Sequence, residues 1–220
     1  MIPAYGGGDL LRAAVRSVLD QDSPRWRLTV IDDGGDDPDL SGFLAGLDDD
    51  RIRYRRNPDN LGINRNFQRC VDEARADLVT VLGGDDRLLP DYVRTVTEAA
   101  EHHPGAAWIH PAVRVIDGDG RPALPLADRI KAVLRPRVRG ARVLGGERLA
   151  ASLLQGNWMY FPSVAFRREV VQKYGFRPGY DVVLDLDLYL RMLFDGHQAV
   201  LLGHTCVEYR RHAASLSSTE

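Results

Sequence analysis

The sequence predicts an α/β fold of the doubly wound type, in which helices flank a mixed, mainly parallel sheet, and three observations support this prediction. Two short apolar runs, residues 27–32 and 78–82, have the β-branched character of strands buried on both faces. Each run is followed by paired acids and glycines, at residues 32–35 and 83–86. Segments with helical spacing alternate with these runs, which is typical of a βαβαβ unit.

The composition is typical of one globular domain. The 220 residues are 44% hydrophobic and 27% charged, and the formal net charge of -2 argues against a nucleic acid partner. No apolar run approaches the roughly 20 residues needed to cross a bilayer, and no signal peptide opens the chain. Cys70 and Cys206 are too few for a disulfide framework. We therefore expect a cytoplasmic protein with a single domain, residues 1–220.

The first third of the chain supplies the elements of the βαβαβ unit in order. Residues 2–5 have the pattern of a short strand, and Asp9 is placed to cap the helix that follows. Residues 51–55 predict a third strand, which a turn-rich loop follows. Residues 63–74 carry apolar side chains at the spacing of an amphipathic helix, and this helix leads into the second apolar run.

The acid pairs are the candidate functional residues of this part. Parallel strands bring their carboxyl ends to one edge of a sheet, where ligands bind in open α/β folds. Asp85 and Asp86 are therefore placed to hold a hard divalent cation, and Asp32 and Asp33 to accept hydrogen bonds from a nucleobase or ribose. The alternative is that each pair only forms a turn. Finding both pairs together favours the ligand site.

The middle of the chain predicts a change of pairing. A helix is expected from Pro90 to about residue 101, followed by strands at residues 106–109 and 112–116. Residues 117–120 read DGDG, a strong reverse-turn signal, so we expect antiparallel character here.

A cationic segment follows. Six basic side chains crowd residues 129–142, namely Arg129, Lys131, Arg135, Arg137, Arg139 and Arg142. One interpretation is a mobile loop that meets phosphate groups or an anionic membrane surface. The other is a solvated, partly disordered insertion.

The last third of the chain contains a second group of acids. A helix is expected at residues 146–155, a strand at residues 163–166 and a strongly apolar helix within residues 180–196. Near the start of that last helix stand three acids: Asp181, Asp185 and Asp187. Capping and the helix dipole would by themselves explain acids at this position, and a catalytic role for one of them is the alternative.

Together these segments resemble the family 2 glycosyltransferases. The family's opening strand and helix are similar to IPAYGGGDLLRAAVRSVLDQ, and its acidic segment to LTVIDDGGDD. Its asparagine-glycine segment, helix and metal-binding strand end look like NLGINRNFQRCVDEARADLVTVLGGDDRLLP. The resemblance implies the GT-A fold, with a Rossmann-like mixed sheet. It further implies a nucleotide-sugar-binding half, residues 1–110, and an acceptor-binding half, residues 111–220.

The resemblance also assigns donor-binding roles. Asp33 would accept the base N–H of uracil or thymine, with Asp32 beside it, so the donor would be of the UDP or dTDP type. The backbone of Ala4 would lie against the base or ribose. Arg65 is the candidate contact for the diphosphate.

For the metal, Mg²⁺ or Mn²⁺, the resemblance implies ligands from two distant parts of the chain. Asp86 would bind the metal directly, and Asp85 would lie near the ribose and the metal. His212, in the closing Tyr-Arg-Arg-His segment, would be a third metal ligand or a diphosphate contact. Many members of the family carry another acid where Gly83 or Gly84 stands here, so the acidic cluster is reduced.

On the acceptor side, the resemblance selects one of the three acids. Asp185 matches the family's general base at the start of its helix, and Asp187 is the fallback. Residues 157–160 would face the acceptor, where Trp158 and Tyr160 are candidates for stacking on sugar rings, with core packing as the alternative.

These expectations define one main hypothesis and two rivals. The main hypothesis is an inverting glycosyltransferase that moves a sugar from a nucleotide sugar to a hydroxyl of a glycan, lipid-linked or small-molecule acceptor. Peripheral membrane contact would occur through residues 129–142. The first rival is a non-catalytic nucleotide-sugar-binding or scaffold protein. The second rival is a nucleotidyltransferase. The sequence argues against it, because no glycine-rich, lysine-bearing loop that could hold a triphosphate follows the first strand.

Overall fold

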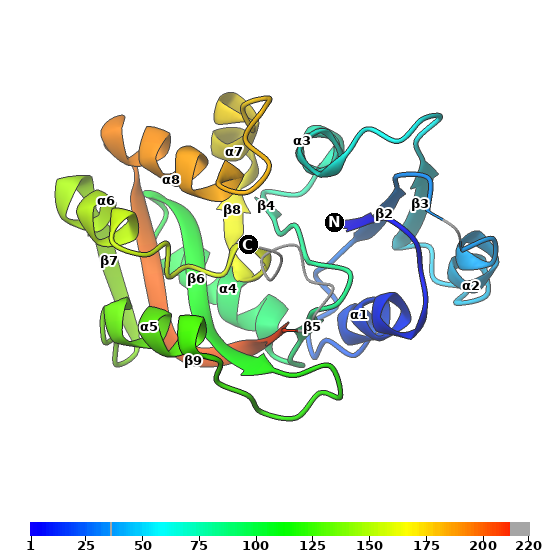
Figure 1. Ribbon diagram of the computed structural model, residues 1–220, viewed down its shortest axis with the longest axis horizontal. Coiled ribbons are helices and arrows are strands. Elements are labelled where there is room, and N and C mark those ends of the chain that lie inside the picture. Colours follow the sequence, from blue (N-terminus) through cyan, green and yellow to red (C-terminus); the bar gives the residue numbers. More distant parts are fainter. Residues whose placement is uncertain (36, 212–220) are drawn as a thin grey trace.

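The computed structural model describes residues 1–35 and 37–211, which form two sheets flanked by helices (Figure 1). Three parallel strands make the first sheet: β1 (Ile2–Ala4), β2 (Leu28–Asp32) and β3 (Ile52–Arg56). Ala4 lies opposite Asp32, and Asp32 lies opposite Arg56. The carboxyl ends of the three strands are therefore level, as expected for the parallel unit predicted from the sequence.

Three helices accompany this sheet. They are α1 (Asp9–Leu19), α2 (Leu40–Ala45) and α3 (Ile63–Glu73). The helix α1 buries Leu11, Val15 and Val18 at helical spacing, as its sequence predicts. The prediction that Asp9 caps this helix was wrong, because the helix begins at Asp9 itself and Gly8 precedes it with no side-chain cap.

The second sheet has the strand order β4-β8-β6-β9-β5, with β7 paired to β9. The bounds are β4 Leu78–Val79, β5 Arg87–Leu88, β6 Ala106–Ile116, β7 Ala141–Gly145, β8 Ala165–Arg167 and β9 Gln198–Arg210. The two central strands β6 and β9 are parallel, and the other pairs are antiparallel. The sheet is mixed, as expected, but the two strands predicted at residues 106–109 and 112–116 are one strand with irregular register.

Residues 78–82 connect the two sheets. The first two of these residues form β4 and pair with β8, whereas the backbone of residues 80–82 runs beside Met1. The amide of Leu82 donates to the carbonyl of Met1, and the amino terminus of Met1 donates to the carbonyl of Thr80, each at 2.9 Å. The predicted five-residue strand is buried at residues 79, 81 and 82 and half-buried at residues 78 and 80. Its extent was wrong, because the chain changes partners in the middle.

Five helices and a short 3-10 turn belong to the second sheet in the described part of the chain. Their bounds are α4 Tyr92–His102, α5 Leu126–Leu134, α6 Gly146–Leu154, η1 Phe161–Ser163, α7 Arg168–Tyr174 and α8 Leu184–Phe194. Figure 1 shows α5 and α6 together beside β7 and β9, with α7 and α8 at the top. Within the described ranges, no helix is long and apolar enough to cross a membrane.

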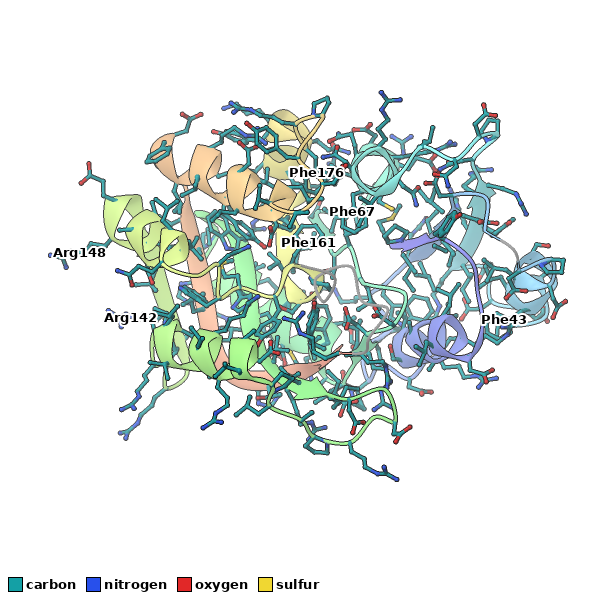
Figure 2. All side chains as sticks on the ribbon, viewed as in Figure 1. Phe43, Phe67, Arg142, Arg148, Phe161 and Phe176 are labelled. Carbon is teal, nitrogen blue, oxygen red and sulfur yellow. The ribbon has the colours of Figure 1, made fainter. Side chains whose placement is uncertain are left out.

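The cationic segment at residues 129–142 is ordered, so its prediction as a mobile or disordered loop was wrong. Its first part lies in α5, and its end begins β7, which pairs with β9. Between them, the guanidinium of Arg135 donates to the carbonyl of Leu202 at 2.8 Å. Arg142 is exposed and points away from the body of the molecule, as does Arg148 (Figure 2).

An aromatic cluster joins the two sides of the molecule. Phe67 of α3 stacks on Phe161 of η1 with ring centroids 5.5 Å apart, and both rings meet Phe176 (Figure 2). The two sheets divide the chain between β3 and β4, before residue 110. The functional division into residues 1–110 and 111–220 stays a prediction.

Candidate functional site

Asp32 ends β2 as a buried, fully engaged carboxylate. One carboxylate oxygen accepts from the amides of Gly34 (3.0 Å) and Gly35 (3.3 Å), and the other accepts from the hydroxyl of Tyr54 at 2.6 Å. The loop after β2 lies tightly against the loop after β1, because a Cβ on Gly35 would sit 1.6 Å from the amide nitrogen of Gly6. Only glycine fits at this approach.

Asp33 ties three segments together. Its carboxylate accepts from the side-chain amide of Asn57 (2.6 Å) and from the backbone amides of Leu61 (2.8 Å) and Gly62 (2.9 Å). Its own amide donates to the carbonyl of Ala4 at 2.8 Å. Asp33 is only 3% exposed, so in this state it holds the 57–62 loop against the ends of β1 and β2. The structure thus brings Ala4, Asp32 and Asp33 together.

Two other residues stand near this edge. Tyr5 follows β1 and is 74% exposed, which leaves a planar aromatic face available to a ligand. Sequence reasoning passed over it, although an aromatic directly after the first strand was visible. Arg65, in the first turn of α3, is exposed, and its side chain makes no hydrogen bond or ion pair within the described residues.

Asp85 and Asp86 converge on Gly83. A Cβ placed on Gly83 would lie 2.5 Å from Oδ2 of Asp86 and 3.0 Å from Oδ1 of Asp85. Two carboxylate oxygens therefore face the small space that this glycine leaves open. The two residues differ in their exposure to solvent, because Asp86 is 1% exposed whereas Asp85 is partly exposed.

Arg210, at the end of β9, donates hydrogen bonds to both Asp85 and Asp86. Its backbone amide donates to Oδ1 of Asp86 at 2.8 Å, and its guanidinium donates to the carbonyls of Asp85, Asp117 and Gly118. Burial, and next the charge of Asp85, raise the pKa of Asp86 above its ordinary value. Removing water from a carboxylate beside a second carboxylate is unfavourable, and a bound cation would relieve it.

This donor set is compatible with a hard divalent cation. Two carboxylate oxygens that converge at one point are ligands that Mg²⁺ and Mn²⁺ accept. Within residues 1–35 and 37–211, no group of three His, Cys, Asp or Glu side chains forms a cation site. Further ligands would have to come from the substrate, from water or from elsewhere in the chain. His212, the predicted third ligand, lies outside the described residues.

Asp185 lies in the first turn of α8 and has one side-chain partner, which comes from the loop after α6. The side-chain amide of Asn157 donates to its two oxygens at 3.2 and 3.1 Å, and the amide of Leu186 donates at 2.8 Å. Asn157 adopts a left-handed backbone with φ of 33°. Burial raises the pKa of Asp185, and the hydrogen bond from Asn157 opposes that shift. Asp185 is 9% exposed.

Asp187, two residues further along, has different surroundings. It accepts from Arg191 at 2.8 Å on the same helix and from Arg177 at 3.3 Å. The two guanidinium groups occupy both carboxylate oxygens of Asp187, so neither oxygen is open to an acceptor hydroxyl. The local chemistry therefore favours Asp185 over Asp187 as a base.

The two aromatic candidates for the acceptor are not alike. Trp158 is fully buried, with its indole N–H donating to Ser152 at 3.0 Å, so in this structure it packs in the core as the alternative interpretation holds. Tyr160 is 8% exposed and donates to Asp128 at 2.9 Å. The ammonium of Lys131 lies over the Tyr160 ring, 4.9 Å from its centroid.

A charged cluster that sequence reasoning missed links the two acidic sites. Asp128 is fully buried and accepts from Arg211 at 3.1 and 3.2 Å. The charge of Arg211 also acts on Asp86, and the charge of Lys131 acts on Asp185. Residues 83 positions apart in the chain form this cluster, so no local pattern could reveal it. The one available signal was Asp128 itself, an isolated acid beside six cations.

Comparisons with known proteins agree with this arrangement. A family model described as "Glycosyl transferase family 2" matches residues 1–175. "Uncharacterized protein MT1568" of Mycobacterium tuberculosis (strain CDC 1551 / Oshkosh) is 30% identical over 224 residues, which cover 99% of this chain and 68% of that protein. "GalNAc(5)-diNAcBac-PP-undecaprenol beta-1,3-glucosyltransferase" of Campylobacter jejuni is 33% identical over 103 residues, covering 46% of this chain and 33% of that enzyme.

The fold has solved counterparts. The crystal structure of S. aureus TarS 1-349 in complex with UDP-GlcNAc matches with a TM-score of 0.77 and 13% identity, covering 100% of this chain and 60% of that one. The complex of the same protein with UDP gives a TM-score of 0.74. At this identity the likeness shows the fold alone. The matched regions span between one third and about two thirds of the length of these relatives.

Proposed function

Because the chain belongs to glycosyl transferase family 2 and has the GT-A fold, we propose that it transfers a sugar from a UDP or dTDP sugar to an acceptor hydroxyl, with inversion at the anomeric carbon. The observation that carries the proposal is the convergence of Asp85 and Asp86 on the space beside Gly83. Asp185, whose surroundings suit a base, stands on another element. The TarS complexes with UDP-GlcNAc and UDP support a uridine nucleotide.

The nucleoside would bind at the carboxyl ends of β1 and β2. Tyr5 offers a ring on which a base can stack, and Asp32 and Asp33 lie beside it. Asp33 would accept the base N–H in exchange for one of its present donors from the 57–62 loop. That exchange makes the loop part of donor binding. Arg65, which has no partner within the described part of the chain, would approach the diphosphate.

Asp85 and Asp86 would hold a divalent metal, Mg²⁺ or Mn²⁺. Asp86 would bind the metal directly, and the more exposed Asp85 would lie near the ribose and the metal. When bound, such a metal stabilises the negative charge that grows on a departing diphosphate. Arg210 fixes the position of both acids through Asp86 Oδ1 and the Asp85 carbonyl.

Asp185 would act as the general base. The acceptor oxygen attacks the anomeric carbon as its proton passes to Asp185, and the bond from that carbon to the diphosphate oxygen breaks. The nucleoside diphosphate leaves with the electron pair of that bond, and attack from the opposite face inverts the configuration. The raised pKa of Asp185 makes it a stronger base than an ordinary aspartate. The amide of Asn157 holds the carboxylate in position.

The acceptor would be a glycan, a lipid-linked molecule or a small molecule, reached from the side of Tyr160. Peripheral membrane contact is part of the proposal. The exposed side chains of Leu126, Ile130 and Val133 recur at helical spacing on the outer face of α5. Arg129 and Arg137 flank them, also exposed. An apolar stripe bordered by cations is the pattern of a helix that lies on an anionic membrane surface.

The experiment that tests the donor site is calorimetric binding of UDP, dTDP and GDP, each with and without Mn²⁺. Wild type is compared with Asp85→Asn and Asp86→Ala, and with Asp77→Asn as a control outside the site. We expect one nucleotide to bind only with metal and only when both acids are present. If none of the three binds under any condition, the donor site is wrong. The nucleotide-sugar-binding form of the non-catalytic rival then fails with it, and a scaffold role remains. Binding without transfer would favour that rival.

A further inference from the structure

A cavity of about 680 Å³ lies between α5 and the second sheet. Its floor comes from residues 112–115 of β6 and from Thr205 of β9, and its walls from residues 122–124, Tyr160 and the inner face of α5. This volume is within the range of small-molecule sites. The proposed donor residues at the ends of β1 and β2 do not line it.

Two cationic side chains line this cavity and lack some of the partners they could have. One, Lys131, lies in α5, and the other, Arg135, directly follows that helix. Lys131 lines it and makes no ion pair within the described ranges, where its ammonium lies over the Tyr160 ring. Arg135 lines it as well and uses one amino group on the Leu202 carbonyl, while its Nε is buried without a partner in the described part of the chain. A buried donor without an acceptor is uncommon and indicates that a ligand can complete it.

The one carboxylate in the lining does not neutralise these cations. Asp128 is already bound by Arg211 and by the Tyr160 hydroxyl. Arg114, also in the lining, is paired with Glu208 at the sheet. Burial, and next the charge of Arg211, lower the pKa of the Lys131 amine, and the charges of Asp185 and Asp128 oppose that shift. The remainder of the lining, such as Val113, Ala123 and Leu124, is mostly apolar.

We propose that this cavity binds a phosphate-class anion, a mono- or diphosphate group carried by the acceptor, between Lys131 and Arg135. The proposal rests on the proposed glycosyl transfer and adds the acceptor's chemical class to it. Arginine and lysine together are the common protein partners of phosphate oxygens. The apolar lining would face the group to which the phosphate is attached.

Contacts around the cavity connect it with the acceptor side. Tyr160 of its lining follows Asn157 by three residues, and the side-chain amide of Asn157 donates to Asp185. Lys131 acts electrostatically on Asp185, the proposed base. An anion between Lys131 and Arg135 would therefore lie on the side of the base, where an acceptor must present its hydroxyl.

The chain offers an internal control for a test on the wild type, because Lys131 and Lys173 are its two lysines. Each lies over a tyrosine ring, Lys131 over Tyr160 and Lys173 over Tyr174, but only Lys131 lines the cavity. The experiment acetylates the amines in metal-free buffer and measures each lysine by mass spectrometry, with and without inorganic pyrophosphate. We expect pyrophosphate to slow labelling of Lys131 several-fold and to leave Lys173 unchanged. Equal slowing of both lysines, or no slowing, would overturn the proposal.

Three further arms identify the source of the phosphate and separate this proposal from the donor site. Glucose 1-phosphate tests a soluble acceptor, and phosphatidylcholine vesicles containing phosphatidic acid, against phosphatidylcholine alone, test a lipid one. Protection by either supports the site, and protection by neither, with pyrophosphate also inactive, rejects it. Asp86→Ala should abolish metal-dependent nucleotide binding and leave the protection of Lys131 intact, so the two proposals fail separately.

A pair of variants tests the same site by affinity. Lys131→Gln with Arg135→Gln removes the two cations of the cavity, and Arg129→Gln with Arg137→Gln removes two exposed cations from the same segment. Pyrophosphate binding by calorimetry should weaken about tenfold or more in the first variant only. Equal weakening in both would mean a general charge effect and would refute the site. The conservative variant Lys131→Arg should retain binding even where the double variant folds poorly.

Discussion

Asp185 and Asp187 stand two residues apart in the first turn of α8, yet their partners give them different chemistry. Asn157 holds Asp185 without neutralising it, whereas two arginines pair with Asp187. We predict that Asp185→Asn lowers kcat by roughly 10²- to 10⁴-fold, the usual contribution of a general base. Nucleotide affinity should stay unchanged. Asp187→Asn is the matched control and should retain most of the turnover, as measured by release of nucleoside diphosphate. Equal losses in both would remove Asp185 from the mechanism.

The acid side of the pH profile should report the same carboxylate. Burial raises the pKa of Asp185 above 3.8, and the base acts only when deprotonated. Turnover should therefore fall as the pH decreases through this raised pKa, at a higher pH than an ordinary aspartate would give. Steady-state kcat across pH measures it. Asn157→Ala removes the hydrogen bond that opposes the shift, and should move the acid limb to higher pH. An acid limb at the same pH in this variant would contradict the assignment.

The space beside Gly83 gives the metal proposal a residue-level test. A Cβ at this position would press on both carboxylates, at 2.5 and 3.0 Å, whereas a Cβ on Gly84 would meet only Leu11 at 3.4 Å. We predict that Gly83→Ala weakens Mn²⁺-dependent nucleotide binding by roughly tenfold or more, the usual cost of disturbing residues around a metal site. Gly84→Ala should bind as the wild type does. Calorimetry decides, and equal effects of the two substitutions would count against the site.

The acids of the site could be predicted from the sequence because each stands in a local pattern, an apolar run followed by acids and glycines. Their partners could not. Asn157 contacts Asp185 across 28 positions of chain, and the charge of Lys131 acts on it across 54, and nothing near either residue indicates these interactions. The burial of Trp158 could not be predicted either. An aromatic residue beside an expected site has the same sequence pattern whether its side chain is buried or exposed.

At the scale of elements, sequence patterns missed the helices α2, α5 and α7, and the surroundings of α5 explain why it was missed. Its apolar residues Leu126, Ile130 and Val133 face solvent, while Asp128 and Lys131 face inward. The usual rule, that the apolar stripe is the buried one, is reversed here. By contrast, α3 buries the stripe that its sequence shows, and it was predicted within a residue. The reversal is itself the observation that supports membrane contact.

Vesicle binding tests this outer face. Leu126→Gln, Ile130→Gln and Val133→Gln together keep good helix formers on α5 and remove its exposed apolar surface. Because fully burying one such side chain contributes about 1.5–3 kcal/mol, even shallow insertion of three should make this variant bind roughly tenfold more weakly. Co-sedimentation with phosphatidylserine vesicles measures it. The control is Leu154→Gln, an exposed leucine on α6. Unchanged binding of the triple variant, or none by the wild type, would contradict membrane contact through α5.

For the whole molecule, the link between the donor and acceptor sides runs through α3. Asn64 donates to the carbonyls of Arg177 and Tyr180, both at 2.9 Å, and Gln68 accepts from the amide of Phe176 at 2.6 Å. These bonds, with the Phe67 cluster, hold the segment that leads into α8 and Asp185. The helix that follows the Asp33-bound loop therefore also sets the position of the proposed base.

This coupling predicts a separation of kinetic effects. Asn64→Ala removes both hydrogen bonds to residues 177 and 180, and should lower the free energy of unfolding by about 1–3 kcal/mol. Because α8 loses its anchor, kcat should fall while the nucleotide Kd stays unchanged. Gln21→Ala is the matched control, since Gln21 donates to the carbonyls of Ser17 and Leu89, away from α8. It should lose comparable stability in urea unfolding and keep its kcat. A similar fall of kcat in both variants would show that general destabilisation, and not the contact between α3 and the segment before α8, controls the base.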